Sequence, residues 1–228
     1  GGSIGEGQAR WLEERLAAHH VRHLPPAGTQ VRSGGDDQLV LVFSHHPPST
    51  MDATDPDPDH PTERRLMGAE VVSILVRYPN VVAWVDGHTH TNGITPHAHP
   101  DGLTSGFWEV TTASHVDWPQ QARVIELVDN HNGTLSLFGT MIEHAASATV
   151  DRDSSDVVGL AGLARELGMN DAGAGPEAKA GSPADRNVEL VLPAPFVNPT
   201  VATTTSTAVP EGAGALAVPV AGSPGLTG

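Results

Sequence analysis

Apolar residues form two short uninterrupted runs in the first half of the chain, and histidines follow each run directly. The runs cover residues 39–43 and 81–85. Both are too short and too rich in Val and Leu for free-standing helices, so they predict strands. Neither run alternates with polar residues, which is typical of strands that are fully buried in a sheet.

Two other segments place apolar residues three and four positions apart, as on one face of a helix. Residues 8–18 carry Ala9, Leu12 and Leu16 at this spacing, and from Thr62 the same pattern runs through Met67, Val71, Ile74, Leu75 and Tyr78. Pro79 ends the second segment. The predicted order is therefore helix, strand, histidine turn, helix, strand, histidine turn.

The remaining pattern is weaker. Residues 106–110 predict a short strand, and residues 123–128 and 135–141 predict two strands joined by an Asn-Gly hairpin turn. Beyond Ala145 the strand pattern is lost, and one short helix is expected between Leu160 and Leu167. We therefore expect an α/β domain, a low-complexity extension and a disordered tail without periodicity. Their ranges are 1–145, 146–196 and 197–228.

Composition narrows the function. The net charge of −15 argues against electrostatic binding to nucleic acid or to an anionic membrane, and it favours divalent cations as partners. The absence of cysteine excludes disulfides, thiolate zinc sites and cysteine nucleophiles. No run approaches the roughly 18 apolar residues of a membrane span, and the start does not resemble a signal peptide. Compartment and oligomeric state stay open. Because the chain opens on Gly1 without Met, we expect that preceding residues are absent.

The histidines lie where chemistry is expected. His45 and His46 follow the first run, and His88 and His90 follow the second. If the two strands are neighbours in one sheet, both pairs meet at the carboxyl ends of the strands, where open α/β sheets bind ligands. Imidazole is a good ligand for zinc, iron, manganese or nickel. We also expect Gly87 to allow the bend of the chain, and Asp86 to orient an imidazole.

A further acidic segment, residues 52–60, has several Asp and Pro residues. It lacks the central Gly and the terminal Glu of an EF-hand loop, so we interpret it as a solvated loop rather than a calcium site.

The two histidine motifs resemble a known family. Phe43-Ser-His-His-Pro47 and Asp86-Gly-His-Thr-His90 are similar, in the same order, to two later motifs of the calcineurin-like metallophosphoesterases. The helix at residues 8–16 resembles one that this family often places just before them, and residues 108–119 resemble a bacterial, mainly actinobacterial, branch. The match covers about residues 5–145 and represents the C-terminal half of such an enzyme.

The resemblance implies a fold, a cofactor and a substrate. The fold would be the C-terminal half of an α/β sandwich of two mixed sheets flanked by helices. The cofactor would be two divalent or trivalent metal ions, Mn, Fe or Zn, and the reaction would be hydrolysis of a phosphate monoester or diester. His45 and His88 would bind one metal and His90 the other, while His46 and His115 would contact substrate or be structural.

The chain also departs from the family. Three earlier motifs, Asp-x-His, Gly-Asp and Gly-Asn-His, supply the bridging carboxylate, further ligands and the general acid, and none precedes His45. We therefore expect a truncated fragment with little activity of its own. One alternative is a non-catalytic metal-binding or structural remnant. Another is an amidohydrolase, where an Asp-x-His-x-His turn ends the first barrel strand, although that fold needs many further strand-helix units.

Overall fold

The computed structural model describes most of the first 196 residues. The described ranges are 1–19, 22–23, 31–32, 37–102, 104–146, 153, 155–171, 176–196 and 217–219. The predicted disordered tail, 197–228, therefore lies outside the described residues, apart from three that form a short strand.

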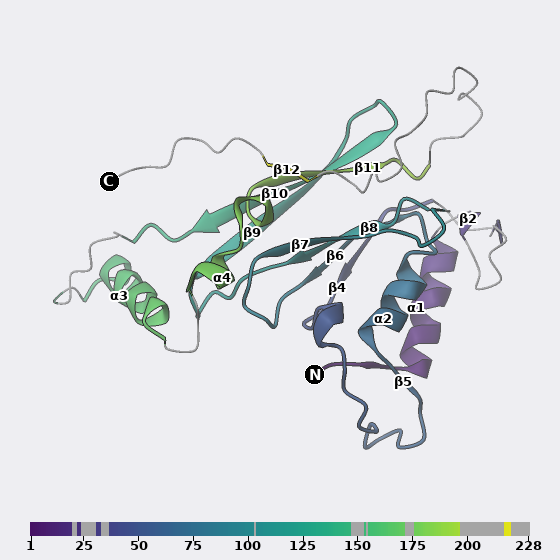
Figure 1. Ribbon diagram of the computed structural model, residues 1–228, viewed down its shortest axis with the longest axis horizontal. Coiled ribbons are helices and arrows are strands. Elements are labelled where there is room, and N and C mark those ends of the chain that lie inside the picture. The colour runs from purple at the N-terminus through teal and green to yellow at the C-terminus, as the bar shows by residue number, and fades with distance from the viewer. Residues whose placement is uncertain are drawn as a thin grey trace.

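A four-stranded mixed sheet carries the histidine motifs (Figure 1). Its strands, in spatial order, are β4 (Val40–Phe43), β6 (Val81–Asp86), β8 (Phe107–Thr111) and β7 (Gly93–His97). The first three are parallel, and β7 runs antiparallel to β8. The prediction that the two apolar runs are neighbouring strands is confirmed, and their carboxyl ends lie at the same edge of the sheet.

The second sheet is antiparallel. Its spatial order is β12 (Ala217–Pro219), β11 (Val188–Pro193), β10 (Thr134–Glu143) and β9 (Gln121–Asp129). The predicted hairpin between β9 and β10 is confirmed. The prediction that no strand follows Ala145 is wrong, because β11 pairs with β10 along its whole length. Strand β11 has four apolar residues, Val188, Leu190, Val191 and Leu192, but this short run lies in Ala- and Pro-rich surroundings that concealed it.

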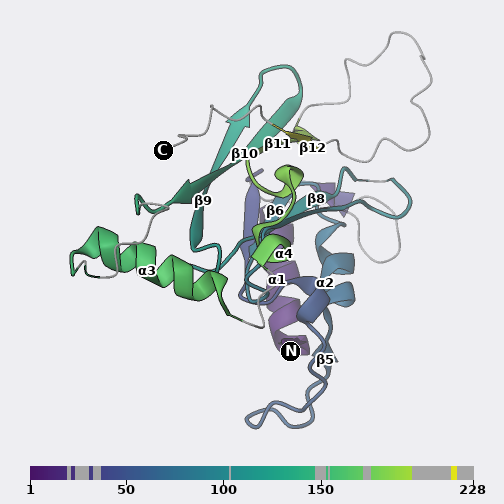
Figure 2. The ribbon, with the colours of Figure 1, turned by 60° about the vertical axis from the view of Figure 1, so that its left-hand side comes forward.

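The molecule has three layers, which Figures 1 and 2 show from two sides. Helices α1 (Glu6–Ala18) and α2 (Gly68–Leu75) cover one face of the mixed sheet, and the antiparallel sheet covers the other. Trp84 points to the helices, whereas Trp108 packs against the second sheet. Helix α3 (Val157–Met169) lies apart from α1 and α2 in both views. The chain is thus a mixed α/β protein, as expected.

Short elements complete the description. They are β1 (Ile4–Gly5), β2 (Arg22–His23), β3 (Val31–Arg32), β5 (Arg65–Leu66), α4 (Pro176–Ala180) and two 3-10 turns, η1 (Pro48–Thr50) and η2 (Pro183–Asp185). None of the helices in the described ranges has the length and apolar character needed to cross a bilayer.

Three expectations need correction. The second helix begins at Gly68 rather than near Thr62, because β5 pairs with β1 just before it and Glu70 accepts a hydrogen bond from the backbone N–H of Met67 (3.0 Å). Strand β4 is not fully buried, because it is an edge strand and the side chain of Phe43 is 69% exposed. Strand β7 occupies residues expected to form a polar loop, and its edge position tolerates Pro96.

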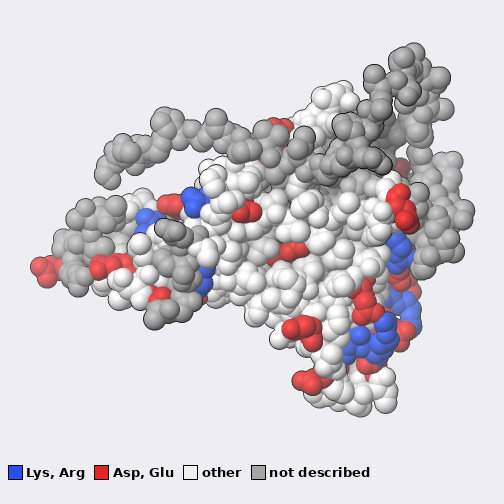
Figure 3. Space-filling model, in the orientation of Figure 1, with Lys and Arg blue, Asp and Glu red and all other residues white. Residues whose placement is uncertain are grey.

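Charged side chains on one face are mixed in sign. Figure 3 shows Lys and Arg beside Asp and Glu on this face, without a broad basic surface. Two of the ion pairs lie around α2. Arg64, before the helix, pairs with Glu70 in it, and Arg77, after the helix, pairs with Glu13 of α1.

Candidate metal centre

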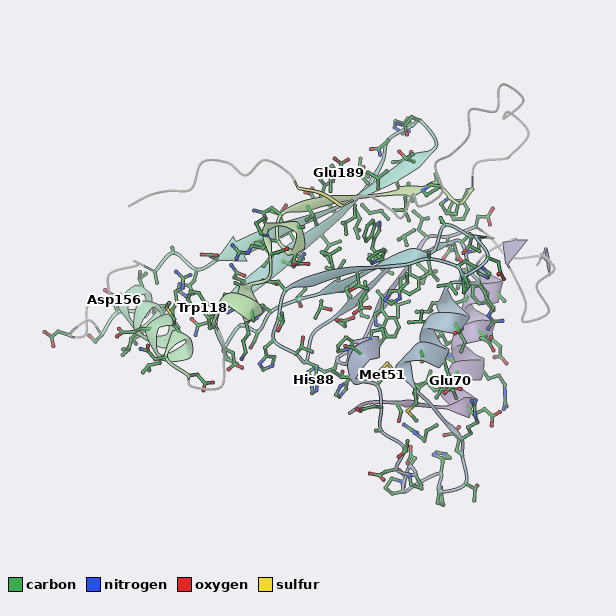
Figure 4. All side chains as sticks on the ribbon, viewed as in Figure 1. Met51, Glu70, His88, Trp118, Asp156 and Glu189 are labelled. Atoms are coloured by element: carbon green, nitrogen blue, oxygen red, sulfur yellow. The ribbon has the colours of Figure 1, made fainter. Side chains whose placement is uncertain are left out.

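Three imidazoles converge at the carboxyl ends of β4 and β6. His45, His46 and His88 each offer a ring nitrogen, and these atoms lie within 4.8 Å of one another. Nε2 of His45 lies 3.2 Å from Nδ1 of His88, and the rings of His46 and His88 are 3.9 Å apart between centroids. Figure 4 shows His88 at this end of the mixed sheet. His45 and His88 lie together, as the order of the strands predicts, and His46, for which we expected a substrate-contact or structural role, is the third ring of the cluster.

The donor set fits one metal ion. Ligand nitrogens about 2.0–2.1 Å from a tetrahedral zinc ion lie roughly 3.4 Å apart, so the separation of His45 and His88 needs little adjustment. Two of the three residues are exposed, and His46 is partly buried, so an ion and a water can reach the cluster. Three neutral imidazoles with an open fourth position are a known ligand set for catalytic zinc.

Backbone hydrogen bonds hold the two histidine turns against each other. The N–H of Ser44 donates to the carbonyl of Val85 (3.1 Å), and the N–H of Gly87 donates to the carbonyl of His45 (3.1 Å). The indole Nε1–H of Trp84 donates to the hydroxyl of Ser44 (2.7 Å). The parallel ladder is thereby extended beyond the strands, and it fixes the spacing of the imidazoles.

His46 is oriented by the 3-10 turn that follows it. The hydroxyl of Thr50 donates to the carbonyl of Pro47 (3.2 Å), so its oxygen is left to accept a hydrogen bond from Nδ1–H of His46 (3.1 Å). This tautomer leaves Nε2 of His46 with a lone pair for a metal. Burial lowers the pKa of His46, and positive charge on His88 or His45 lowers it further. The neutral form that a metal requires is therefore favoured.

The turn after β6 is strained at its histidines. His88 and His90 adopt left-handed backbone conformations, with φ of 60° and 56°. This region costs a residue with a Cβ atom on the order of 1 kcal/mol, and such strain is common at functional sites. The expectation that Gly87 provides the bend is wrong, because a Cβ atom there would meet nothing closer than 3.8 Å.

His90 lies outside the three-histidine cluster. Its Nδ1 is hydrogen-bonded to Oδ2 of Asp117, which follows β8 in the chain. The same oxygen lies 3.5 Å from Nζ of Lys179 in α4. The hydrogen bond from His90 lowers the pKa of Asp117, and the ammonium group of Lys179 lowers it further. Neither partner is evident from the sequence, because Asp117 and Lys179 lie 27 residues and more from His90 along the chain.

A buried amide ties these segments together. The side chain of Asn92 donates to Oε1 of Gln121 (2.8 Å) and to the carbonyl of Ala180 (3.3 Å). Its oxygen accepts from the N–H of Ala113 (3.1 Å) and from Arg123 (3.2 Å). Asn92 therefore joins the turn after β6 to the loop after β8, which carries Asp117, and to the end of α4, which carries Lys179.

Asp86 does not orient an imidazole, contrary to our expectation. Its side chain is 4% exposed, and in the described part of the chain neither carboxylate oxygen has a hydrogen-bond partner. Burial raises the pKa of Asp86 to about 7. The hydroxyl of Thr111, which donates to Glu109 (3.4 Å), lowers the pKa of Asp86, whereas the negative charge of Glu109 raises it. The carboxylate that contacts an imidazole of the histidine turn after β6 is Asp117 instead.

The other predicted residues lie elsewhere. His115 is exposed, does not join the cluster and lines a cavity of about 420 Å³ together with Phe43 and Arg123. In the acidic loop, Asp57 lies 4.0 Å from His60 and 3.8 Å from Arg65. Among the described residues, no carboxylate belongs to the three-histidine cluster.

When the chain is compared with known proteins, no protein-family model and no curated protein matches it. The functional argument therefore depends on the motifs and on the geometry of the histidines.

Proposed function

We propose that this chain carries the histidine ligands of a metal-dependent phosphoesterase. The observation that supports the proposal is the convergence of three imidazoles, on the turns after two neighbouring parallel strands, to within 4.8 Å. The turn sequences are the two that resemble calcineurin-like metallophosphoesterases. The mixed α/β fold, the order of the motifs and the donor chemistry are consistent with one another.

The residues of this chain would have separate tasks at the site. His45, His46 and His88 hold the ion, and Thr50 keeps Nε2 of His46 available for it. A bound metal would supply an activated water and polarise a phosphoryl oxygen of the substrate. His90 is the fourth histidine near the site, and with a second metal it would complete the dinuclear arrangement that the family resemblance implies. Mn, Fe and Zn all accept imidazole ligands.

The finer fold assignment belongs to the same proposal. A three-layer arrangement of helices, mixed sheet and second sheet agrees with the C-terminal half of a metallophosphoesterase-like sandwich. The second sheet here is antiparallel, whereas the resemblance implies two mixed sheets. Among the described strands, β4 pairs on one side only, and its exposed Phe43 supports the idea that further strands belong beside it.

The cluster lacks a carboxylate, and this shapes the expected activity. Two metal ions about 4 Å apart, as in a dinuclear site, repel each other strongly unless an anionic ligand lies between them. Because no described carboxylate joins the cluster, we expect that residues 1–228 hold one metal and hydrolyse phosphate esters poorly. Activity should require a segment with the Asp-x-His, Gly-Asp and Gly-Asn-His motifs.

The same observation favours a second candidate, a metal-binding protein without catalysis. Three imidazoles alone suffice to bind zinc, whereas phosphoryl transfer between two metals needs the bridging ligand. The amidohydrolase alternative is less well supported, because β7 follows β6 in antiparallel orientation to β8, and no described helix lies between β6 and β8.

The test combines metal content with turnover. Purified chain is loaded with Zn²⁺ or Mn²⁺, the metal is quantified, and hydrolysis of an aryl phosphate and an aryl phosphodiester is followed. We expect about one metal per chain, lost in His88→Ala and retained in the exposed control His131→Ala. Turnover should stay near background until the missing motifs are supplied in trans.

The outcomes separate the readings. Metal binding without turnover, even with those motifs supplied, would leave the non-catalytic candidate. Equal metal content in wild type and His88→Ala would overturn both. Metal-dependent turnover by residues 1–228 alone, abolished in His88→Ala, would mean that carboxylates of this chain complete the site.

A further inference from the structure

The contact between His90 and Asp117 determines which ring nitrogen of His90 is free. An ionised carboxylate only accepts hydrogen bonds. Nδ1 of His90 must therefore be protonated, and it donates the hydrogen bond to Oδ2 of Asp117. Neutral imidazole has one proton, and Nε2 is then left with a lone pair. In the described part of the chain, Nε2 of His90 makes no hydrogen bond.

Besides the hydrogen bond from His90, two further contacts hold Asp117 in place. Its backbone N–H donates to the hydroxyl of Ser114 (3.2 Å), and its carboxylate lies 3.5 Å from Nζ of Lys179. The carbonyl of Lys179 accepts a hydrogen bond from the backbone N–H of Asn92 (2.9 Å), two residues beyond His90. The cation is therefore anchored to the same turn that carries the histidine.

The segment after α4 approaches the backbone of Asn92 closely at one glycine, Gly181. Gly181 has φ of 70°, and a Cβ atom there would lie 2.6 Å from the carbonyl oxygen of Asn92. Only glycine fits both the left-handed conformation and the short approach. Figure 4 shows Trp118, the neighbour of Asp117, beside helix α3. A Cβ atom at Gly168 of this helix would lie 3.1 Å from the backbone nitrogen of Trp118, so the loop that carries Asp117 packs closely against α3.

We infer that Asp117 is a positioning residue that holds His90 in its Nδ1–H tautomer and presents Nε2 as the ring nitrogen that binds metal. Lys179 keeps the carboxylate in position. This inference rests on the proposed function for the identity of the ligand that Nε2 binds, but the tautomer is a property of the metal-free chain. Metal-binding histidines commonly donate their second ring nitrogen to a carboxylate, and removal of that partner costs about 10–100-fold in metal affinity.

The experiment measures the tautomer directly. Long-range ¹H–¹⁵N correlation spectra of ¹⁵N-labelled, metal-free protein are recorded at about pH 8, with His90 identified by its loss in His90→Gln. We expect the Nδ1–H tautomer in wild type and in Asp117→Asn, whose amide oxygen can still accept the bond. In Asp117→Ala the signal should change to the Nε2–H tautomer. When the missing motifs are supplied in trans, as in the test of the proposed function, Zn²⁺ titration should show a loss of affinity of about 10–100-fold at the second metal site, which His90 would serve, for Asp117→Ala only.

A second Asp–His pair in the chain is the matched control. Nδ1 of His131 lies 3.3 Å from Asp129, but its side chain is 87% exposed, so solvent competes for both nitrogens. Asp129→Ala should leave both the His90 tautomer and the zinc affinity unchanged. An unchanged His90 tautomer in a folded Asp117→Ala protein would overturn the inference. A changed tautomer with unaltered zinc affinity would confirm the positioning by Asp117 and contradict the role of His90 as a metal ligand.

Discussion

Nε2 of His45 lies 3.2 Å from Nδ1 of His88, although 43 residues separate the two histidines in the chain. The distance follows from strand pairing, because β4 and β6 are parallel neighbours and each histidine lies just beyond its strand. Adjacent strands are about 4.8 Å apart, which is within the range that two imidazoles need to share an ion. Without an ion, one of these two nitrogens donates a hydrogen bond to the other.

The position of His46 leads to the first prediction. His46→Ala should weaken Zn²⁺ binding about as strongly as His88→Ala, because both rings belong to the same cluster. Calorimetric titration measures both affinities, with the exposed His131→Ala variant as control. A much smaller effect of His46→Ala would return His46 to the substrate-contact or structural role that the family resemblance gave it.

The second prediction concerns pH. Metal and proton compete for the imidazole lone pairs, so zinc affinity should rise as pH passes through roughly 6.5, the ordinary pKa of histidine. Since burial and the neighbouring histidines lower the pKa of His46, this ligand loses its proton at a lower pH than an exposed histidine does. His46 therefore stays available as a ligand at lower pH, and its replacement should still weaken zinc binding at the low-pH end of the profile. Zinc affinity that is constant from pH 5 to 8 would contradict histidine ligation.

The sequence predicts where the histidines gather, but not which of them form the cluster. Two apolar runs that end in histidines predict a shared edge of a sheet, and this follows from strand geometry alone. Which imidazoles turn inward depends on the left-handed backbone of His88 and His90 and on the bond between His46 and Thr50. These are side-chain and turn conformations that no periodicity encodes. Asp117 is brought to His90 only by the packing of the loop after β8.

The same division holds for the fold. Strands with long apolar patterns, such as β6, were predicted almost to their ends. Strands that depend on a neighbour for their stability were missed: β7 contains Pro96, and β11 lies in a region without other strand signals. Local pattern gives little weight to such segments, whereas pairing in the folded sheet stabilises them.

The buried face of β11 gives the third prediction. Leu190 is 1% exposed and packs with Leu137 between the two sheets. Leu190→Ala should lower the free energy of unfolding by about 2–5 kcal/mol, because it removes buried methyl groups and leaves a cavity. Leu160→Ala in α3, where the side chain is 51% exposed, should change it by about 0.5 kcal/mol or less. Chemical denaturation compares the two, and equal effects would mean that β11 does not belong to the core.

The last prediction concerns Asp86 in the metal-free protein. Its pKa is about 7 in the folded chain, raised by burial, against about 3.9 in an unfolded one. Between these values the folded state binds more protons, so the free energy of unfolding falls as pH rises, by at most about 4 kcal/mol. Asp86→Asn cannot ionise, so its stability relative to wild type should increase steadily from pH 4.5 to pH 8. Denaturant titrations with EDTA measure this difference, and the exposed Asp55→Asn variant should show no such trend. Parallel stability curves for wild type and Asp86→Asn would show that Asp86 is ionised in the folded chain throughout, and would point to a cation or donor beside its carboxylate.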